Sequence, residues 1–176
     1  YARAAGMAVE VAELDPIRRL FAHYDGFPTP SLEKGLERAD LLVTATGHAD
    51  AVTIEQLEAG ARSGLVLINA GHGGDEIDID GIQRAAERVD HIGDQVARYR
   101  LTSGKRLTVL GQGHPLNIVL NSGSPEPVLL HFAVLGLALE WLAGAGADLE
   151  DGEHVVPEAI EADAASAALS ALQLTL

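Results

Sequence analysis

The sequence predicts an α/β protein, with a Rossmann-type doubly wound parallel sheet followed by a C-terminal helical extension. Short apolar runs alternate with segments of helical spacing, a pattern typical of strand–helix–strand units. The clearest run, Leu65–Ile68, is apolar throughout, as in a strand buried on both faces of a parallel sheet. Beyond Pro115 the pattern becomes helical. We therefore expect a Rossmann domain over residues 1–115 and a helical extension over residues 116–176.

The amino-acid composition argues against several classes of binding partner. The 176 residues include 12 basic and 26 acidic ones, and the net charge of −14 argues against a nucleic-acid or anionic-membrane surface. The absence of cysteine excludes disulfides and thiolate metal sites, and we expect no metal. Val128–Ala145 is interrupted by polar residues and glycines, so we expect a buried helix and not a membrane span. No signal peptide is visible, and we expect a cytoplasmic protein.

Capping and turn residues predict the N-terminal elements. Residues 1–5 favour a helix that ends at Gly6. In residues 7–12 β-branched residues alternate loosely with others, which predicts a strand that ends at Glu13. Asp15 and Pro16 predict the start of a helix, as its N-cap and first helical residue. Ser31 opens a further helix that we expect to end near Ala39.

The remaining elements alternate up to Leu110 and are helical beyond it. Strands are expected at Asp40–Gly47, Leu65–Ile68 and Arg106–Leu110, the last in a hairpin with Tyr99–Leu101, and helices at Ile54–Ala61 and Ile79–Arg88. The extension should hold a short helical turn at Leu116–Ser122 and helices from Ser124 to about Leu142 and from Glu158 to about Leu172, separated by a break at Gly144–Gly146 and an acidic loop at Asp148–Glu153.

Small and polar residues follow the predicted Leu65–Ile68 strand. Ligands of open α/β sheets bind beyond the carboxyl ends of the strands. Asn69-Ala70-Gly71-His72 occupies that position, and Gly71 would let a ligand approach the backbone closely. Asn69 either hydrogen-bonds a carboxamide through its donor and acceptor or forms a turn. His72 either transfers a proton near neutral pH or is a structural histidine.

Residues after two other strands are candidates for the same ligand. Thr44, Thr46 and Gly47 end the neighbouring strand and would line the ribose–nicotinamide side of a dinucleotide. His114 lies in a glycine-rich loop after the last strand. It either points at that ligand or is an ordinary loop residue.

Glu13 is a candidate determinant of the selectivity between NAD and NADP. An acid at the end of the second strand of a dinucleotide fold binds the adenosine ribose and repels a 2′-phosphate, which favours NAD. Such an acid lies about 20 residues after the glycine-rich loop, so that loop would precede Tyr1 and we expect a longer polypeptide. Alternatively, Glu13 only caps the next helix, and the nearby Arg18 accommodates the 2′-phosphate of NADP.

Several segments, taken in order along the chain, resemble one enzyme family. They are Val11–Ile17, Val43–Gly47, Ile68–His72 with Glu76–Asp78, Val96–Tyr99 and Gly113–Pro115. In this order and spacing they resemble the NAD-binding half of S-adenosylhomocysteine hydrolase. The similarity runs over nearly the whole chain. The Asn-Ala-Gly-His segment with the following Glu-Ile-Asp, and the Gly-His-Pro segment, are in that order fairly specific to that family.

The resemblance implies a bound NAD and a nucleoside substrate. In this family S-adenosylhomocysteine is hydrolysed reversibly to adenosine and homocysteine. The 3′-hydroxyl of the substrate is oxidised to a transient 3′-ketone, homocysteine is eliminated, water adds, and the hydride returns. The resemblance also implies a homotetramer and an upstream catalytic domain, so residues 1–176 alone are expected to lack activity.

The same resemblance implies roles for the candidate residues. Glu13, with Arg18 beside it, would bind the adenosine ribose. The segment 70–72 would bind the nicotinamide end, with His72 near the reacting sugar. His114 would close over cofactor and substrate.

Departures from the family pattern leave two alternatives. Gly73 and Gly74 stand where the family usually has Phe-Asp, and a cofactor-binding Asn expected near Val109 is missing. Because these changes surround the reacting end of the cofactor, one alternative is a divergent enzyme that oxidises another nucleoside or sugar hydroxyl. The other is a catalytically silent NAD-binding partner.

Overall fold

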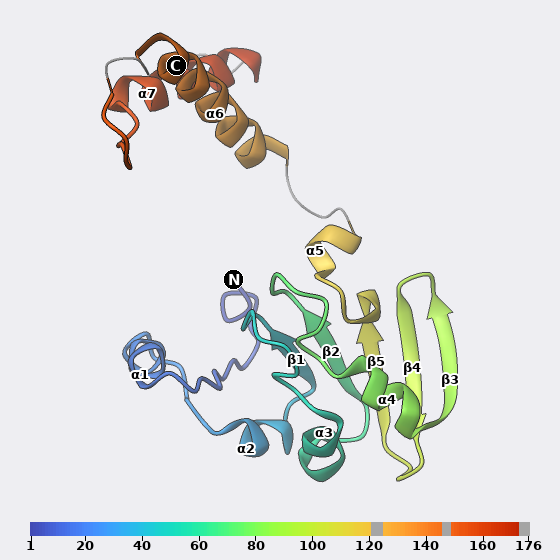
Figure 1. The fold of residues 1–176 in the computed structure, drawn as a ribbon. Coiled ribbons are helices and arrows are strands. Elements are labelled where there is room, and N and C mark those ends of the chain that lie inside the picture. Colours follow the sequence, from blue (N-terminus) through green and yellow to red (C-terminus); the bar gives the residue numbers. More distant parts are fainter. Residues whose placement is uncertain (121–124, 146–148, 173–176) are drawn as a thin grey trace. The chain divides into compact units, whose positions relative to one another are not determined.

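A five-stranded sheet organises the first part of the chain in the computed structural model, which describes residues 1–120, 125–145 and 149–172 (Figure 1). The strand order is β1-β2-β5-β4-β3. β1 (Leu41–Thr44), β2 (Leu65–Asn69) and β5 (Arg106–Leu110) are parallel. β4 (Val96–Leu101) pairs antiparallel with β5, and β3 (Ala86–Gly93) pairs antiparallel with β4. The predicted α/β class, the parallel central strands and the β4–β5 hairpin are confirmed.

Side-chain caps set the starts of the helices. α1 (Pro16–Tyr24) begins where predicted, because Oδ1 of Asp15 accepts hydrogen bonds from the backbone N–H groups of Ile17 at 2.8 Å and Arg18 at 3.0 Å. α3 (Ile54–Gly60) begins with a capping box between Thr53 and Gln56. Ser31 caps α2 (Leu32–Leu36), and Asp78 caps α4 (Ile79–Ala85).

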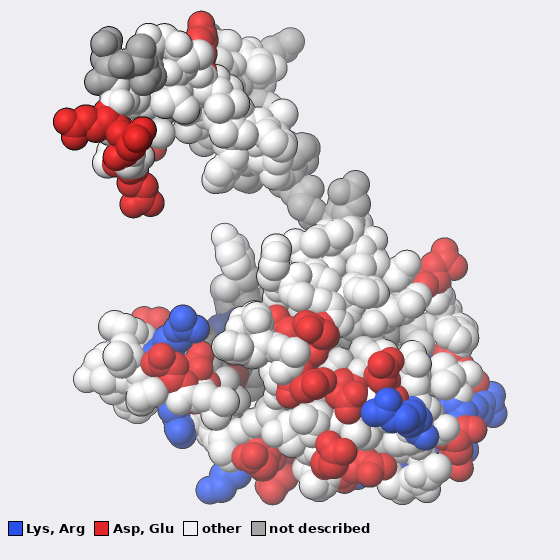
Figure 2. All heavy atoms as spheres, viewed as in Figure 1, with Lys and Arg blue, Asp and Glu red and all other residues white. Residues whose placement is uncertain are grey.

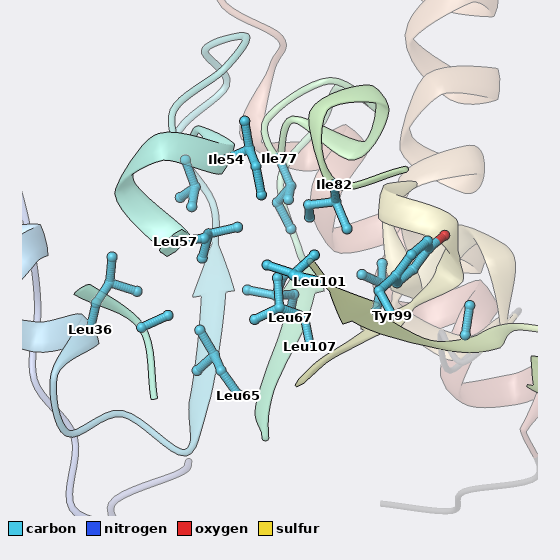
Figure 3. Close-up of a cluster of buried hydrophobic side chains, with 14 residues drawn as sticks. Leu36, Ile54, Leu57, Leu65, Leu67, Ile77, Ile82, Tyr99, Leu101 and Leu107 are labelled. Carbon is cyan, nitrogen blue, oxygen red and sulfur yellow. The ribbon is translucent and has the colours of Figure 1, made fainter. Parts of the chain in front are cut away.

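The core lies between one face of the sheet and helices α3 and α4. Figure 3 shows Leu67, Leu101 and Leu107 of the sheet pointing towards side chains of these helices, including Leu57 and Ile82. All five are fully buried. This one-sided packing corrects the expectation that β2 is buried on both faces, because its alternate residues Val66 and Ile68 are only half-buried.

Residues 7–12 do not form the predicted strand. These residues have no regular secondary structure, and a backbone hydrogen bond ties them to another segment, from the N–H of Val11 to the carbonyl of Pro28 at 3.0 Å. A strand needs a ladder of such bonds, and none forms here among the described residues. Residues 1–5 form a turn in place of a regular helix. This turn ends as helices do, with Gly6 at φ +87° and the N–H of Met7 bonded to the carbonyl of Ala2 at 3.1 Å.

The predicted Ile79–Arg88 helix stops at Ala85, and the next eight residues form the unpredicted strand β3. Antiparallel pairing to β4 over Ala86–Gly93 explains the change. The predicted end of the Ser31 helix near Ala39 is also corrected, since α2 ends at Leu36.

A second compact unit, Gly123–Leu176, follows the first, Tyr1–Ser122. Within the first unit, α5 (Leu116–Val119) packs on the 3₁₀ turn η1 (Gly111–Gly113) that follows β5.

The two helices of the second unit, α6 (Pro125–Ala145) and α7 (Glu158–Ala171), pack on each other. The helical prediction for Val128–Ala145 is confirmed, but its burial is not, because Phe132 and Leu139 are 65% and 57% exposed in this chain. The predicted boundaries at Ser122, Ser124, Gly146 and Asp148 lie outside the described residues. No helix in the described ranges is long and apolar enough to cross a membrane.

Candidate functional site

Three loops meet at the carboxyl edge of the parallel strands. We call them the strand-end loops: residues 45–47 after β1, 70–74 after β2 and 111–115 after β5. The register places Thr44 opposite Asn69, and the N–H of Ala70 donates to the carbonyl of Thr44 at 2.8 Å. A parallel bridge joins Asn69 to Pro115. The structure thus brings together the candidate residues that the sequence places after separate strands.

Asn69 lies fully buried beneath these loops. Its Oδ1 accepts from the N–H of Gly71 at 2.7 Å and from Oγ1 of Thr44 at 3.4 Å. Its Nδ2 donates to the carbonyl of Gly113 at 2.9 Å and to the carbonyl of Gly73. Both donors and the acceptor are therefore used within the protein, as in the turn-forming alternative, and in this structure they do not face a ligand.

Glu76 is the residue of this site that sequence reasoning missed. Its Oε2 accepts from the N–H and the Oγ1 of Thr46, at 2.8 and 2.9 Å, and its Oε1 accepts from the N–H of Gly47 at 2.8 Å. We call Glu76 with these two residues the Glu76 clamp. A Cβ on Gly71 would collide with Oε1 of Glu76, so only glycine fits at this position of the loop after β2. The sequence shows Glu76 only as one letter of a family segment, without a periodicity that signals burial.

The pKa of Glu76 lies below its usual value. Burial raises this pKa, because it disfavours the charged form, but the hydrogen bonds from the backbone of Thr46 and Gly47 and from threonine hydroxyls lower it by more. Among the described residues no lysine or arginine forms an ion pair with Glu76. The carboxylate therefore depends on the donors of the β1 loop.

Acid is expected to weaken the Glu76 clamp. Because the pKa is lower in the folded chain than in the unfolded one, ionised Glu76 contributes stability at neutral pH, and this contribution is lost as the pH falls through the lowered pKa. Glu76→Gln should lower the free energy of unfolding at neutral pH. The difference in this free energy between parent and variant should disappear as the pH falls below about 4.3, the ordinary pKa of glutamate. Urea titrations over a pH series measure this difference, and a difference independent of pH would contradict the assignment.

His72 and His114 are both exposed at this edge. A Cβ on Gly74 would lie 2.6 Å from Nδ1 of His114, so the loop after β2 and the imidazole of the loop after β5 are closely packed. Beside His114 is a pocket of about 340 Å³, which is also lined by His91 and Gln112. Gln112 has φ +55°, an uncommon conformation for a residue other than glycine, as often found near functional sites. The sequence had indicated only a glycine-rich loop here.

Glu13 and Arg18 lie apart from this cluster of contacts. Oε1 of Glu13 accepts from the N–H of Asp15 at 2.9 Å, next to the start of α1, and Arg18 is exposed. In the described part of the chain no hydrogen bond or ion pair links either side chain to the strand-end loops.

Acidic side chains are spread over the face of the first unit that carries α3 and α4, and basic ones are fewer there (Figure 2). Within the described residues no group of three or more His, Asp or Glu is placed to hold a metal ion. Because basic side chains are few on this face, binding of a dinucleotide would depend on specific backbone and side-chain groups at the strand ends and not on a general positive field.

Small residues and two imidazoles are accessible at the strand-end loops. Gly47 has φ +70° and no atom within 4 Å of a Cβ built on it, and the neighbouring Ala70 is exposed. Small residues let a flat ring approach the backbone, and His72 and His114 supply exposed imidazoles at the same edge.

Comparison with known proteins shows the family of this chain. A family model for the NAD-binding domain of S-adenosyl-L-homocysteine hydrolase matches residues 1–123. The chain is 33% identical over 177 residues to the S-inosyl-L-homocysteine hydrolase of Methanopyrus kandleri and 33% identical over 175 residues to the adenosylhomocysteinase of Saccharolobus solfataricus. Each match covers 99% of this chain and 42% of the relative.

The adenosylhomocysteinase of Pyrobaculum aerophilum is 39% identical over 145 residues, which are 80% of this chain and 33% of the relative. The chain thus spans less than half the length of these relatives. The predicted family resemblance and the predicted cofactor, NAD, are confirmed at the level of the domain. Residues 1–123 are an NAD-binding domain, and the chain belongs to the S-adenosyl-L-homocysteine hydrolase family.

Proposed function

We propose that the protein carrying this chain hydrolyses the thioether of an S-nucleosyl-homocysteine reversibly, with S-adenosylhomocysteine as the first candidate substrate. The observation that carries the proposal is the convergence of the strand-end loops, which present His72 and His114 at one edge of an NAD-binding domain. NAD, when bound, supplies the oxidant that accepts a hydride from the 3′-hydroxyl and later returns it.

The loops after β1 and β2 hold the nicotinamide end in this proposal. Thr46, Gly47, Ala70 and Gly71 form the surface that the ring approaches, because they combine small side chains with backbone groups. Thr44 and Asn69 act from beneath, since both are buried and their contacts fix the turns after the strands.

The exposed histidines and the N-terminal segment complete the site. His72 moves a proton at the reacting sugar, since an imidazole changes charge near neutral pH. His114 closes the site from the third loop. Glu13 binds the adenosine ribose, with Arg18 beside it. The proposal includes a homotetramer and an additional catalytic domain as partners of this chain.

S-inosylhomocysteine is the second candidate substrate. The relative from Methanopyrus kandleri is an S-inosyl-L-homocysteine hydrolase, and its match covers this chain as completely as the adenosylhomocysteinase matches do. The two substrates differ in the purine base and share the sugar and thioether on which the strand-end loops would act.

Parallel assays with the two thioethers separate these candidates. The natural polypeptide that carries this sequence is supplied with NAD and each thioether, and released homocysteine is measured with a thiol reagent. We expect faster release from S-adenosylhomocysteine. Preference for the inosyl compound would select the second candidate, and NAD binding without release from either would indicate a divergent enzyme or a silent NAD-binding partner.

Glu13→Ala is expected to weaken NAD binding roughly 10- to 100-fold, the loss of hydrogen bonds to a charged group worth about 1.5–3 kcal/mol. Calorimetry with NAD and with NADP on parent and variant measures this effect. Glu10→Ala is the matched control, because Glu10 is an acid of the same segment that pairs with Arg38 at 2.8 Å. Equal affinity of the parent for NADP would overturn the role of Glu13 and point to Arg18.

A further inference from the structure

The backbone that carries Glu76 is fixed by hydrogen bonds of its own, separate from those of the carboxylate. The N–H of Val52 donates to the carbonyl of Glu76 at 3.1 Å, and the N–H of Asp50 donates to the carbonyl of Asp75 at 2.8 Å. Ile77, the next residue, is buried in the core. Glu76 is therefore anchored to the body of the domain before its side chain reaches the β1 loop.

The carboxylate is the point at which the β1 loop is held. Two backbone N–H groups and one hydroxyl, from Thr46 and Gly47, converge on it within 2.8–2.9 Å. With no cationic side chain paired to it in the described part of the chain, these donors stabilise the buried charge. The conformation of residues 46–47 and the charge of Glu76 are consequently coupled.

The clamp also reaches the second strand-end loop. Gly71 lies so close to Oε1 of Glu76 that a Cβ would collide with it, while the N–H of Gly71 is bonded to Asn69 at 2.7 Å. One carboxylate thus sets the spacing between the β1 loop and the β2 loop.

We propose that Glu76 is a positioning residue for the cofactor: from outside the cofactor's contact surface, it holds Thr46, Gly47 and Gly71 in the arrangement that receives the nicotinamide end of NAD. The inference rests on the proposed use of the strand-end loops. It assigns to Glu76 no contact with the substrate or the cofactor.

The test combines amide exchange with cofactor affinity in the natural polypeptide. Glu76→Gln keeps the size of the side chain but puts an amide group against the donors of the clamp. We expect faster hydrogen exchange at the amides of Thr46 and Gly47, and an NAD dissociation constant raised about 10-fold or more. Glu76→Asp keeps the charge but is too short for all three bonds, so its effect should be in the same direction and smaller. It also serves as the second variant if the glutamine variant fails to fold.

Asp78→Asn is the matched control. Asp78 lies two residues further on, and its carboxylate accepts from the N–H groups of Gly81 at 2.7 Å and Ile54 at 3.4 Å, neither of which belongs to the strand-end loops. This variant should change exchange at the start of α4 and leave NAD affinity per folded molecule within about twofold.

Each other outcome has a distinct meaning. Faster exchange at residues 46–47 with unchanged NAD affinity would reduce Glu76 to a structural role and overturn the inference alone. Unchanged exchange would show that the clamp is not formed, which also overturns it. A parent protein that binds no NAD would overturn the proposed function and this inference together.

Discussion

His72→Asn is expected to slow turnover of the preferred thioether by about 10²-fold or more, the usual scale for a lost general acid–base group. The fold and most of the NAD affinity should remain. The imidazole is exposed, and within the described residues no hydrogen bond or ion pair holds it. Asparagine keeps a polar side chain of similar reach but cannot change charge near neutral pH. Single-turnover kinetics and thermal unfolding, measured on the same samples, give the two quantities.

His23→Asn is the matched control for this substitution. His23 is exposed in the last turn of α1, where its ring lies beside Tyr24. It should leave turnover unchanged. If His72→Asn melts early but turns over normally per folded molecule, His72 is a structural histidine and the proposed proton transfer is wrong.

Asn69→Ala is expected to lower the free energy of unfolding by about 2–4 kcal/mol, because buried groups left without hydrogen-bond partners cost about 1–3 kcal/mol each. The substitution removes the acceptor of the Gly71 N–H and the donor to the carbonyls of Gly73 and Gly113. Rehydration at the sheet edge limits the loss to a few kcal/mol. Urea unfolding measures it, and Asn117→Ala, at an exposed position of α5, should change stability little.

Asn69→Asp separates the donor from the acceptor. It retains an oxygen for the N–H of Gly71 but replaces the Nδ2 donor by an oxygen facing two carbonyls. We expect it to be at least as destabilising as alanine at neutral pH. A neutral effect of both substitutions would mean that Asn69 does not hold the strand-end loops together.

Elements with local caps could be predicted from the sequence, because a cap acts within a few residues. α1 begins where Asp15 predicts, and α3 begins at Ile54 as expected, with Thr53 as its cap. β3 could not be predicted in this way. Its first residues, Ala86–Arg88, favour a helix, and they become extended through long-range pairing with β4 that local propensity does not contain. Residues 7–12 show the converse, since a pattern that suits a strand forms no ladder among the described residues.

In the candidate site, too, locally determined features could be predicted and those that depend on long-range contacts could not. The rule that ligands bind beyond parallel strands placed Thr44, Asn69 and His114 at one edge, and the structure brings them together there. Glu76 was missed because its burial depends on donors from Thr46, 30 residues earlier in the chain. The turn-forming role of Asn69 likewise became visible only once its contact with Gly113, 44 residues later, was known.

The central claim is that the nicotinamide end of NAD binds at the strand-end loops, and an NMR titration of NAD into the isotope-labelled protein tests it most directly. The amides of Gly47, Gly71, His72 and His114 should shift together and saturate with one dissociation constant. Ser63, Gly64 and Gly104, at the opposite end of the sheet, should not move. Binding of NAD that leaves the strand-end loops unshifted, or that shifts the opposite end, would contradict the account.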